Sequence, residues 1–132
     1  MRVLLADDND DFRSVAARVL EAEFDVVATV GDGQAAIEET ARLKPNVLVL
    51  DVSMPVLNGI EAARQIRAAG DQARIVILTV HEDPDFVRSA RQAGAEGYVV
   101  KSRLACDLLV ALKEVLAGRT FVSPLNSLAR EV

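Results

Sequence analysis

The sequence predicts an α/β fold: a doubly wound parallel sheet with helices on both of its faces. Short continuous runs of aliphatic residues alternate with segments of helical hydrophobic spacing, and this alternation occurs five times. The chain has 132 residues, 51 % hydrophobic but only 4 % aromatic, which suits one domain with an aliphatic core. Alternating strands and helices favour a parallel sheet, because each helix returns the chain to the same edge.

Five strands are expected, and each is predicted to be buried on both faces. The apolar runs are continuous and do not alternate with polar residues, which is typical of strands covered on both sides. The last run is weaker than the other four. In chain order the runs are Val3–Ala6, Val26–Val30, Val47–Leu50, Ile75–Val80 and Gly97–Val100.

A helix is expected after each strand. Lys44-Pro45 should end the second helix, because the residue before proline avoids the helical region. Gly70, Gly94 and Gly118 stand where the third, fourth and fifth helices should end in a left-handed residue. The positions that share a helical face are Phe12, Val15, Ala16, Val19 and Leu20; Ala36, Ile37, Thr40 and Ala41; Ile60, Ala63, Ile66 and Arg67; Phe86, Val87 and Ala90; Leu108, Leu109, Leu112, Val115 and Leu116.

Composition argues against several classes of protein. A net charge of -5 does not suit a domain whose whole surface wraps nucleic acid. The first apolar run ends in two carboxylates, unlike a signal peptide, and no run approaches the ~20 apolar residues of a membrane helix. The single cysteine, Cys106, allows no intrachain disulfide. We therefore expect a cytoplasmic protein without membrane contact.

Polar side chains gather at the carboxyl ends of the predicted strands. Asp7 and Asp8 follow the first strand, Asp51 the third and Lys101 the fifth, and Thr79 lies near the end of the fourth. Ligands bind along this edge in open α/β sheets. Close carboxylates repel one another, and Mg²⁺, which prefers oxygen ligands, relieves the repulsion. With an aspartate as nucleophile, a lysine charge and a hydroxyl donor, the set indicates phosphoryl transfer to a carboxylate.

Further motifs lead from this chemistry to a family. They are Met54-Pro55 with Asn58-Gly59, then Ala93-Gly94-Ala95, and Tyr98. Together with the strand-end residues they resemble the receiver domain of bacterial two-component response regulators, over residues 1 to about 118. The ending from Leu116 to Pro124 resembles receivers of the LuxR/NarL type, which precede a helix-turn-helix DNA-binding domain.

The resemblance implies a flavodoxin-like (CheY-like) strand order, 2-1-3-4-5. It implies that Asp51 is the phosphoacceptor, phosphorylated by a histidine kinase. Mg²⁺ would be held by Asp8, Asp51 and the backbone carbonyl of Ser53, with Asp7 acting through a water molecule. Lys101 would contact the phosphoryl group. Such a domain is a signalling protein and not an enzyme, since it catalyses only its own phosphorylation and dephosphorylation.

The resemblance also implies a switch and an output. Thr79 would move toward the phosphoryl group, and Tyr98 would turn inward to fill the space. Residues 1–118 would form the receiver, and residues 119–132 would be a linker or tail toward an output domain absent from this chain. Dimerisation on activation, and transcription control through DNA contacts of that output domain, are expected.

Two neighbours of Thr79 affect the expected rates. Val80 stands where many receivers carry alanine or glycine, and its larger side chain is expected to slow phosphoryl exchange. His81 lies near the mouth of the site, where it is expected either to orient the water that hydrolyses a phosphoaspartate or to be a solvated neighbour.

Two other functions stay open from the sequence alone. One is a degenerate receiver that acts as a binding module without phosphorylation. The other is a nucleotide-binding domain, because Gly31-Asp32-Gly33-Gln34-Ala35-Ala36 fits a dinucleotide fingerprint with Asp51 twenty residues further on. Against the second reading, the chain is short for two mononucleotide-binding halves, and Asp7 and Asp8 would repel a pyrophosphate.

Overall fold

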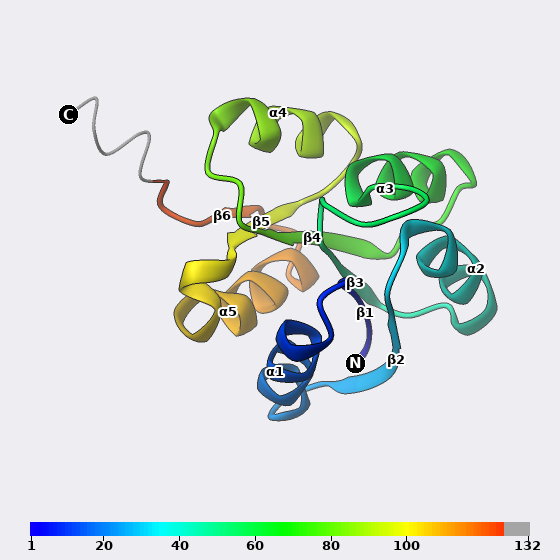
Figure 1. Ribbon diagram of the computed structural model, residues 1–132, viewed down its shortest axis with the longest axis horizontal. Helices are drawn as coiled ribbons and strands as arrows, with labels where there is room; N and C mark the ends of the chain where they lie inside the picture. Colours follow the sequence, from blue (N-terminus) through cyan, green and yellow to red (C-terminus); the bar gives the residue numbers. More distant parts are fainter. Residues whose placement is uncertain (126–132) are drawn as a thin grey trace.

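A computed structural model of the chain describes residues 1–125, in which one parallel sheet lies between two layers of helices (Figure 1). Within these residues the strand order is β2-β1-β3-β4-β5-β6, and every neighbouring pair is parallel. The predicted order 2-1-3-4-5 is therefore confirmed, with one further strand at the β5 edge.

The elements alternate along the chain as the hydrophobic pattern predicts. The strands are β1 (Arg2–Ala6), β2 (Asp25–Val30), β3 (Val47–Leu50), β4 (Arg74–Thr79), β5 (Gly97–Val100) and β6 (Phe121–Val122). The helices are α1 (Asp10–Glu21), α2 (Gly33–Leu43), α3 (Gly59–Ala68), α4 (Pro84–Gln92) and α5 (Leu104–Leu116), with a short 3₁₀ turn, η1 (Lys101–Arg103), before α5.

Each face of the sheet has its own aliphatic core. Helices α1 and α5 cover one face, where Ala16 and Leu112 pack with Leu5. Helices α2, α3 and α4 cover the other, where Ile66 packs with Leu48. Strands β1 and β3 lie in the middle of the sheet and are almost wholly buried. These buried strands give the polar residues at their carboxyl ends a fixed base.

The prediction that all strands are buried on both faces is wrong for β2. Its residues are mostly half-buried, and Asp25 and Thr29 are exposed, because β2 is the edge strand and pairs only with β1. Strand β4 also ends one residue earlier than predicted. Val80 lies beyond the strand, and 65 % of its surface is exposed, so it is not part of the buried apolar run.

The helix ends follow the predicted residues. Helix α2 ends at Leu43 as predicted, and Lys44 before the proline leaves the right-handed helical region for a left-handed conformation (φ 50°). Gly70, Gly94 and Gly118 all have the positive φ that was predicted. Of the predicted helix face in α1, Val15 is half exposed, because that part of the helix faces away from the sheet.

The stretch after α5 contains structure that the sequence did not predict. Strand β6 pairs with β5, and Ser123 and Leu125 behind it are buried. Residues 121–125 thus add a strand and two buried side chains to the sheet, whereas Arg119 and Thr120 are exposed. The rest of the predicted linker or tail, residues 126–132, lies outside the described part of the chain. In the described residues, no helix is both long and apolar enough to cross a lipid bilayer.

We expect Gly59→Ala to lower the free energy of unfolding by about 3 kcal/mol, the upper end of the usual range for overpacking. A Cβ at Gly59 would lie 1.9 Å from the backbone oxygen of Asp51, and backbone cannot move aside as a flexible side chain can. Urea unfolding measures the change. Gly118→Ala is the control: it has open space but a φ of +86°, so we expect a cost of about 1–2 kcal/mol. Equal costs for the two variants would contradict the packing argument.

Candidate phosphoryl and metal site

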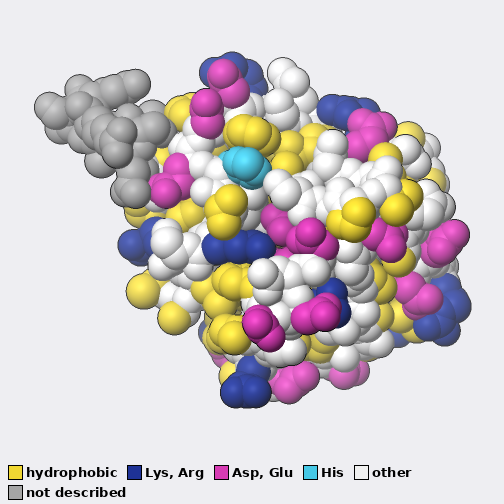
Figure 2. Space-filling model, viewed as in Figure 1, with side chains coloured by type: hydrophobic (Ala, Val, Ile, Leu, Met, Phe, Trp, Pro, Cys, Tyr) yellow, Lys and Arg dark blue, Asp and Glu magenta, His cyan; other side chains and the backbone are white. Residues whose placement is uncertain are grey.

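The predicted site residues meet at the carboxyl edge of the sheet because neighbouring parallel strands end there together. Asp7 follows β1, Asp51 follows β3 and Lys101 follows β5. The backbone N–H of Asp51 donates to the carbonyl of Ala6, so the ends of β1 and β3 are held in register. Figure 2 shows Asp and Glu side chains grouped in the middle of this face, near a basic side chain and the single histidine.

The acidic cluster consists of Asp7, Asp8 and Asp51. Carboxylate oxygens of the three residues lie within 4.8 Å of one another. Asp7 and Asp51 are buried, whereas Asp8 is exposed at the mouth of the site. One oxygen of Asp7, Oδ1, accepts from the backbone N–H of Asn9 at 2.9 Å. The other, Oδ2, is buried without a well-formed hydrogen bond.

Lys101 supplies the positive charge of the site. Its Nζ lies 2.7 Å from Asp7 Oδ2 and 3.1 Å from Asp51 Oδ2, and 4.3 Å from the centre of the Phe12 ring. Burial alone would lower the pKa of Lys101, but the close contact with Asp7 and the charge of Asp51 outweigh it and raise this pKa. The ammonium therefore stays charged and offsets part of the acidic cluster.

Asp51 remains electrostatically disfavoured in spite of this partner. Burial, followed by the charge of Asp7, raises the pKa of the Asp51 carboxyl, and these effects exceed the lowering by Lys101 and by the Ser53 N–H. The cluster therefore holds more negative charge than Lys101 compensates. A divalent cation ligated by oxygens would remove this imbalance.

The residues present fit Mg²⁺. Carboxylate oxygens are the ligands it prefers, and two or three protein oxygens suffice because the ion keeps several waters. Buried Asp7 Oδ2, with an ammonium but no well-formed hydrogen bond, is consistent with such a role. Ser53, whose carbonyl was the further predicted ligand, lies two residues after Asp51 and donates its N–H to Asp51 Oδ1 at 3.4 Å. The ligand assignments stay predictions.

Thr79 and Tyr98 lie on neighbouring strands and are linked through the backbone of His81. Thr79 is fully buried at the end of β4, and its Oγ1 accepts from the His81 N–H at 3.3 Å. Tyr98 points inward, with 2 % of its surface exposed, and its hydroxyl donates to the His81 carbonyl at 2.8 Å. Burial, followed by the charges of Asp83 and Glu82, raises the pKa of Tyr98, so the hydroxyl stays protonated and able to donate.

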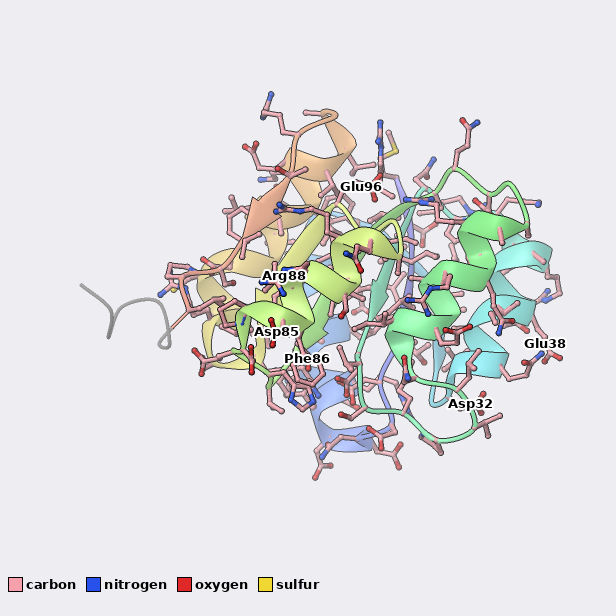
Figure 3. The ribbon with its side chains drawn as sticks, turned by 90° about the horizontal axis from the view of Figure 1, so that it is seen from above. Asp32, Glu38, Asp85, Phe86, Arg88 and Glu96 are labelled. Atoms are coloured by element: carbon pink, nitrogen blue, oxygen red, sulfur yellow. The ribbon has the colours of Figure 1, made fainter. Side chains whose placement is uncertain are left out.

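The His81 ring joins the site to α4. Its Nε2 lies 3.1 Å from Ser53 Oγ, and the ring stacks on Phe86 with centroids 4.2 Å apart and 9° between the planes. Phe86 lies near the start of α4, and Figure 3 shows it on the opposite side of the molecule from Glu96. His81 is thus a held side chain and not a freely solvated one. The sequence did not reveal the roles of Phe12 and Phe86, because helical periodicity marks both simply as core positions.

The glycine turn before α2 is explained by packing. A Cβ at Gly33 would lie 2.1 Å from the backbone oxygen of Leu57, so glycine is needed for the approach of the β3–α3 loop. The Asp32 carboxylate accepts from the Ala35 N–H at 2.7 Å and so takes the place that a phosphate would need at this helix end. Neither feature favours a dinucleotide site.

Comparisons with known proteins agree with this geometry. Residues 3–113 match the response regulator receiver domain family. Among curated proteins, the chain is similar to the transcriptional regulatory protein DegU of Brevibacillus brevis, with 33 % identity over 126 residues. That match covers 94 % of this chain and 53 % of DegU, so the chain spans about half the length of this relative.

Solved structures resemble the chain over nearly its whole length. A LuxR-family response regulator from Aurantimonas sp. SI85-9A1 superposes with a TM-score of 0.89 and 36 % identity, covering 98 % of this chain and 93 % of the other. The isolated receiver domain of RcsB from Salmonella enterica serovar Typhimurium, studied with the phosphomimetic BeF₃⁻, gives a TM-score of 0.86 and 28 % identity. It covers 98 % of this chain and 96 % of its own.

We expect Asp51→Asn to raise the free energy of unfolding at pH 7 by roughly 0.5–2 kcal/mol, the gain that single stabilising substitutions commonly give. Since the folded-state pKa of Asp51 is raised, its ionisation opposes folding once the pH exceeds the ordinary value of 3.8. The gain should therefore shrink as the pH falls to 4 and below. Urea unfolding at both pH values measures it, with exposed Asp25→Asn as control. An Asp51→Asn variant that is less stable than the parent at pH 7 would refute the claim that ionised Asp51 opposes folding.

Proposed function

Because the chain belongs to the response regulator receiver domain family, we propose that it accepts a phosphoryl group on Asp51 from a histidine kinase. The observation that carries the proposal is the buried Asp51 carboxylate, which shares Lys101 with Asp7 at the carboxyl edge of the sheet. A degenerate receiver would not need this intact set of three carboxylates, a lysine and a buried threonine. The same set is unsuited to a pyrophosphate.

The proposed reaction moves a phosphoryl group from nitrogen to oxygen. Asp51 Oδ attacks the phosphorus of a phosphohistidine, a P–O bond forms, and the P–N bond breaks with its electron pair kept by the histidine nitrogen. Lys101 Nζ, next to Asp51 Oδ2, is in position to contact a phosphoryl oxygen, and the Thr79 hydroxyl is available to donate to another. Hydrolysis by water returns Asp51 to its carboxylate.

Mg²⁺ would be held by Asp8, Asp51 and the Ser53 carbonyl, with Asp7 acting through water. When bound, it supplies positive charge that offsets the carboxylates and the incoming phosphoryl oxygens. This chain's own residues orient the nucleophile and restrict the access of water. Lys101 fixes the orientation of Asp51, and the buried walls around Asp7 and Asp51 limit access of water to the cluster.

The proposed switch uses the links through His81. Phosphorylation would draw the Thr79 hydroxyl toward the phosphoryl group and so pull on the loop that His81 begins. The structure has the inward arrangement of Tyr98, in which its hydroxyl closes on the His81 carbonyl. We assign phosphorylation the role of shifting the population toward this arrangement, which changes the face formed by α4, β5 and α5.

The proposed output is transcription control. Relatives such as DegU are named as transcriptional regulatory proteins and are about twice as long as this chain. We propose that residues 1–118 are the receiver and that residues 119–132 lead toward a LuxR-type DNA-binding domain, with dimerisation on activation. Phosphohistidine donors of this class act in the cytoplasm, where we place this chain.

Incubation of the protein with Mg²⁺ and acetyl phosphate is expected to add one phosphoryl group, detected as an increase in intact mass. Asp51→Asn should show none, and omission of Mg²⁺ should abolish the addition. Asp25→Asn, an exposed carboxylate on β2, should be phosphorylated like the parent. A mass increase that persists in Asp51→Asn would contradict the assignment of the phosphoacceptor.

His81→Ala is expected to lengthen the lifetime of the phosphoaspartate about tenfold, because the held ring is in position to orient the hydrolytic water. The expected change is smaller than the 10²–10⁴-fold of full general-base catalysis. The measurement is the decay of the phosphorylated mass. Asp85→Ala, which breaks an exposed pair with Arg88 on α4, is the control. An unchanged lifetime in His81→Ala would show that the ring has no such role.

A further inference from the structure

The segment after α5 is joined to the rest of the domain by a buried polar network that the proposed function does not use. Its members are Asp107 on α5 and Ser123 after β6, which are 6 % and 1 % exposed. Ser123 Oγ donates to Asp107 Oδ2 at 2.7 Å. Arg103 clamps the same carboxylate with Nε at 2.7 Å and Nη2 at 3.2 Å. Such buried groups are costly unless fully paired, so their partners are informative.

The hydroxyl of Ser123 continues the sheet where the backbone of β6 stops. Strand β6 pairs with β5 through Val122, and the Ser123 N–H donates to the Tyr98 carbonyl at 2.9 Å. The next donor on β5, the Val100 N–H, is satisfied by Ser123 Oγ at 3.2 Å. Ser123 thus holds the last residue of β5.

Lys101 directly follows that residue. It begins the turn η1, and Arg103 ends this turn. The turn is therefore held at both ends by one network: Val100 through Ser123, and Arg103 through Asp107. Between these two points the chain presents the Lys101 ammonium to Asp7 and Asp51.

We propose that Asp107 and Ser123 are positioning residues for Lys101, and that they couple the phosphoryl site to the segment that follows α5, residues 119–125. Without the Ser123 hydroxyl, the Val100 N–H loses its acceptor and Asp107 loses one donor. The turn that carries Lys101 then loosens, and the site binds a phosphoryl analogue less tightly. Such coupling is reciprocal. If docking of residues 119–125 on the sheet strengthens ligand binding at Asp51, the bound ligand must strengthen the docking of these residues by the same factor.

This inference rests on the proposed function only for its ligand, so the test has a ligand-free arm. In the parent, Ser123→Ala and Asp107→Asn, amide hydrogen exchange at Val100 and Lys101 is measured without ligand. Both variants should exchange at least about fivefold faster at these residues, the lower end of typical coupling. Glu23→Gln is the matched control, since it removes another ion pair of α5, to Lys113, without touching β5 or residues 119–125.

The second arm measures the affinity for beryllofluoride with Mg²⁺. It should fall at least about fivefold in both variants and stay unchanged in Glu23→Gln, while the ligand slows exchange at residues 119–125 of the parent. A folded Ser123→Ala or Asp107→Asn protein with affinity and Lys101 exchange within twofold of the parent would overturn the inference. If Ser123→Ala does not fold, Asp107→Asn decides. A parent that fails to bind beryllofluoride would refute the proposed phosphoryl site, and the ligand-free arm would still decide the positioning role.

Discussion

The Lys101 ammonium between Asp7 and Asp51 is the interaction on which the site depends. It joins the ends of β1, β3 and β5 through two contacts of 2.7 and 3.1 Å. Without it, two buried carboxylates would face each other in a region of low dielectric constant. Removing the cation from a buried ion pair in such a region is strongly unfavourable. With it, the cluster is stable yet still short of positive charge. That shortage is what suits the site to a divalent cation and a phosphoryl group.

The fold provides this geometry through burial of the strands rather than through the loops themselves. Strands β1 and β3 are covered on both faces, so their ends cannot move independently of the cores. The loops that follow the strands lie outside the two cores, and backbone or ring contacts hold them in place. His81 is the clearest example, since Thr79, Tyr98, Ser53 and Phe86 all contact it. A small displacement of Thr79 therefore has a direct path to α4.

The sequence predicted the parts that depend on local pattern and not those that depend on neighbours. Continuous apolar runs located β1 to β5, and strand-end polarity brought together Asp7, Asp8, Asp51 and Lys101. The exposure of β2 escaped prediction because hydrophobicity does not reveal that a strand lies at the edge. Two-residue β6 is too short to carry a pattern. Buried Asp107 resembles any acidic residue on a helix, since its partners Arg103 and Ser123 lie on a turn and beyond the helix. Strand order came from the family resemblance alone.

The most direct test of the central claim is a crystal structure of the protein with Mg²⁺ and beryllofluoride. Our account predicts beryllium on Asp51, Lys101 Nζ in contact with fluorine, and Mg²⁺ among Asp8, Asp51 and the Ser53 carbonyl. Thr79 should donate to a second fluorine while Tyr98 keeps its bond to the His81 carbonyl. Beryllofluoride bound elsewhere, or bound on Asp51 without any contact between Lys101 and fluorine, would contradict the account.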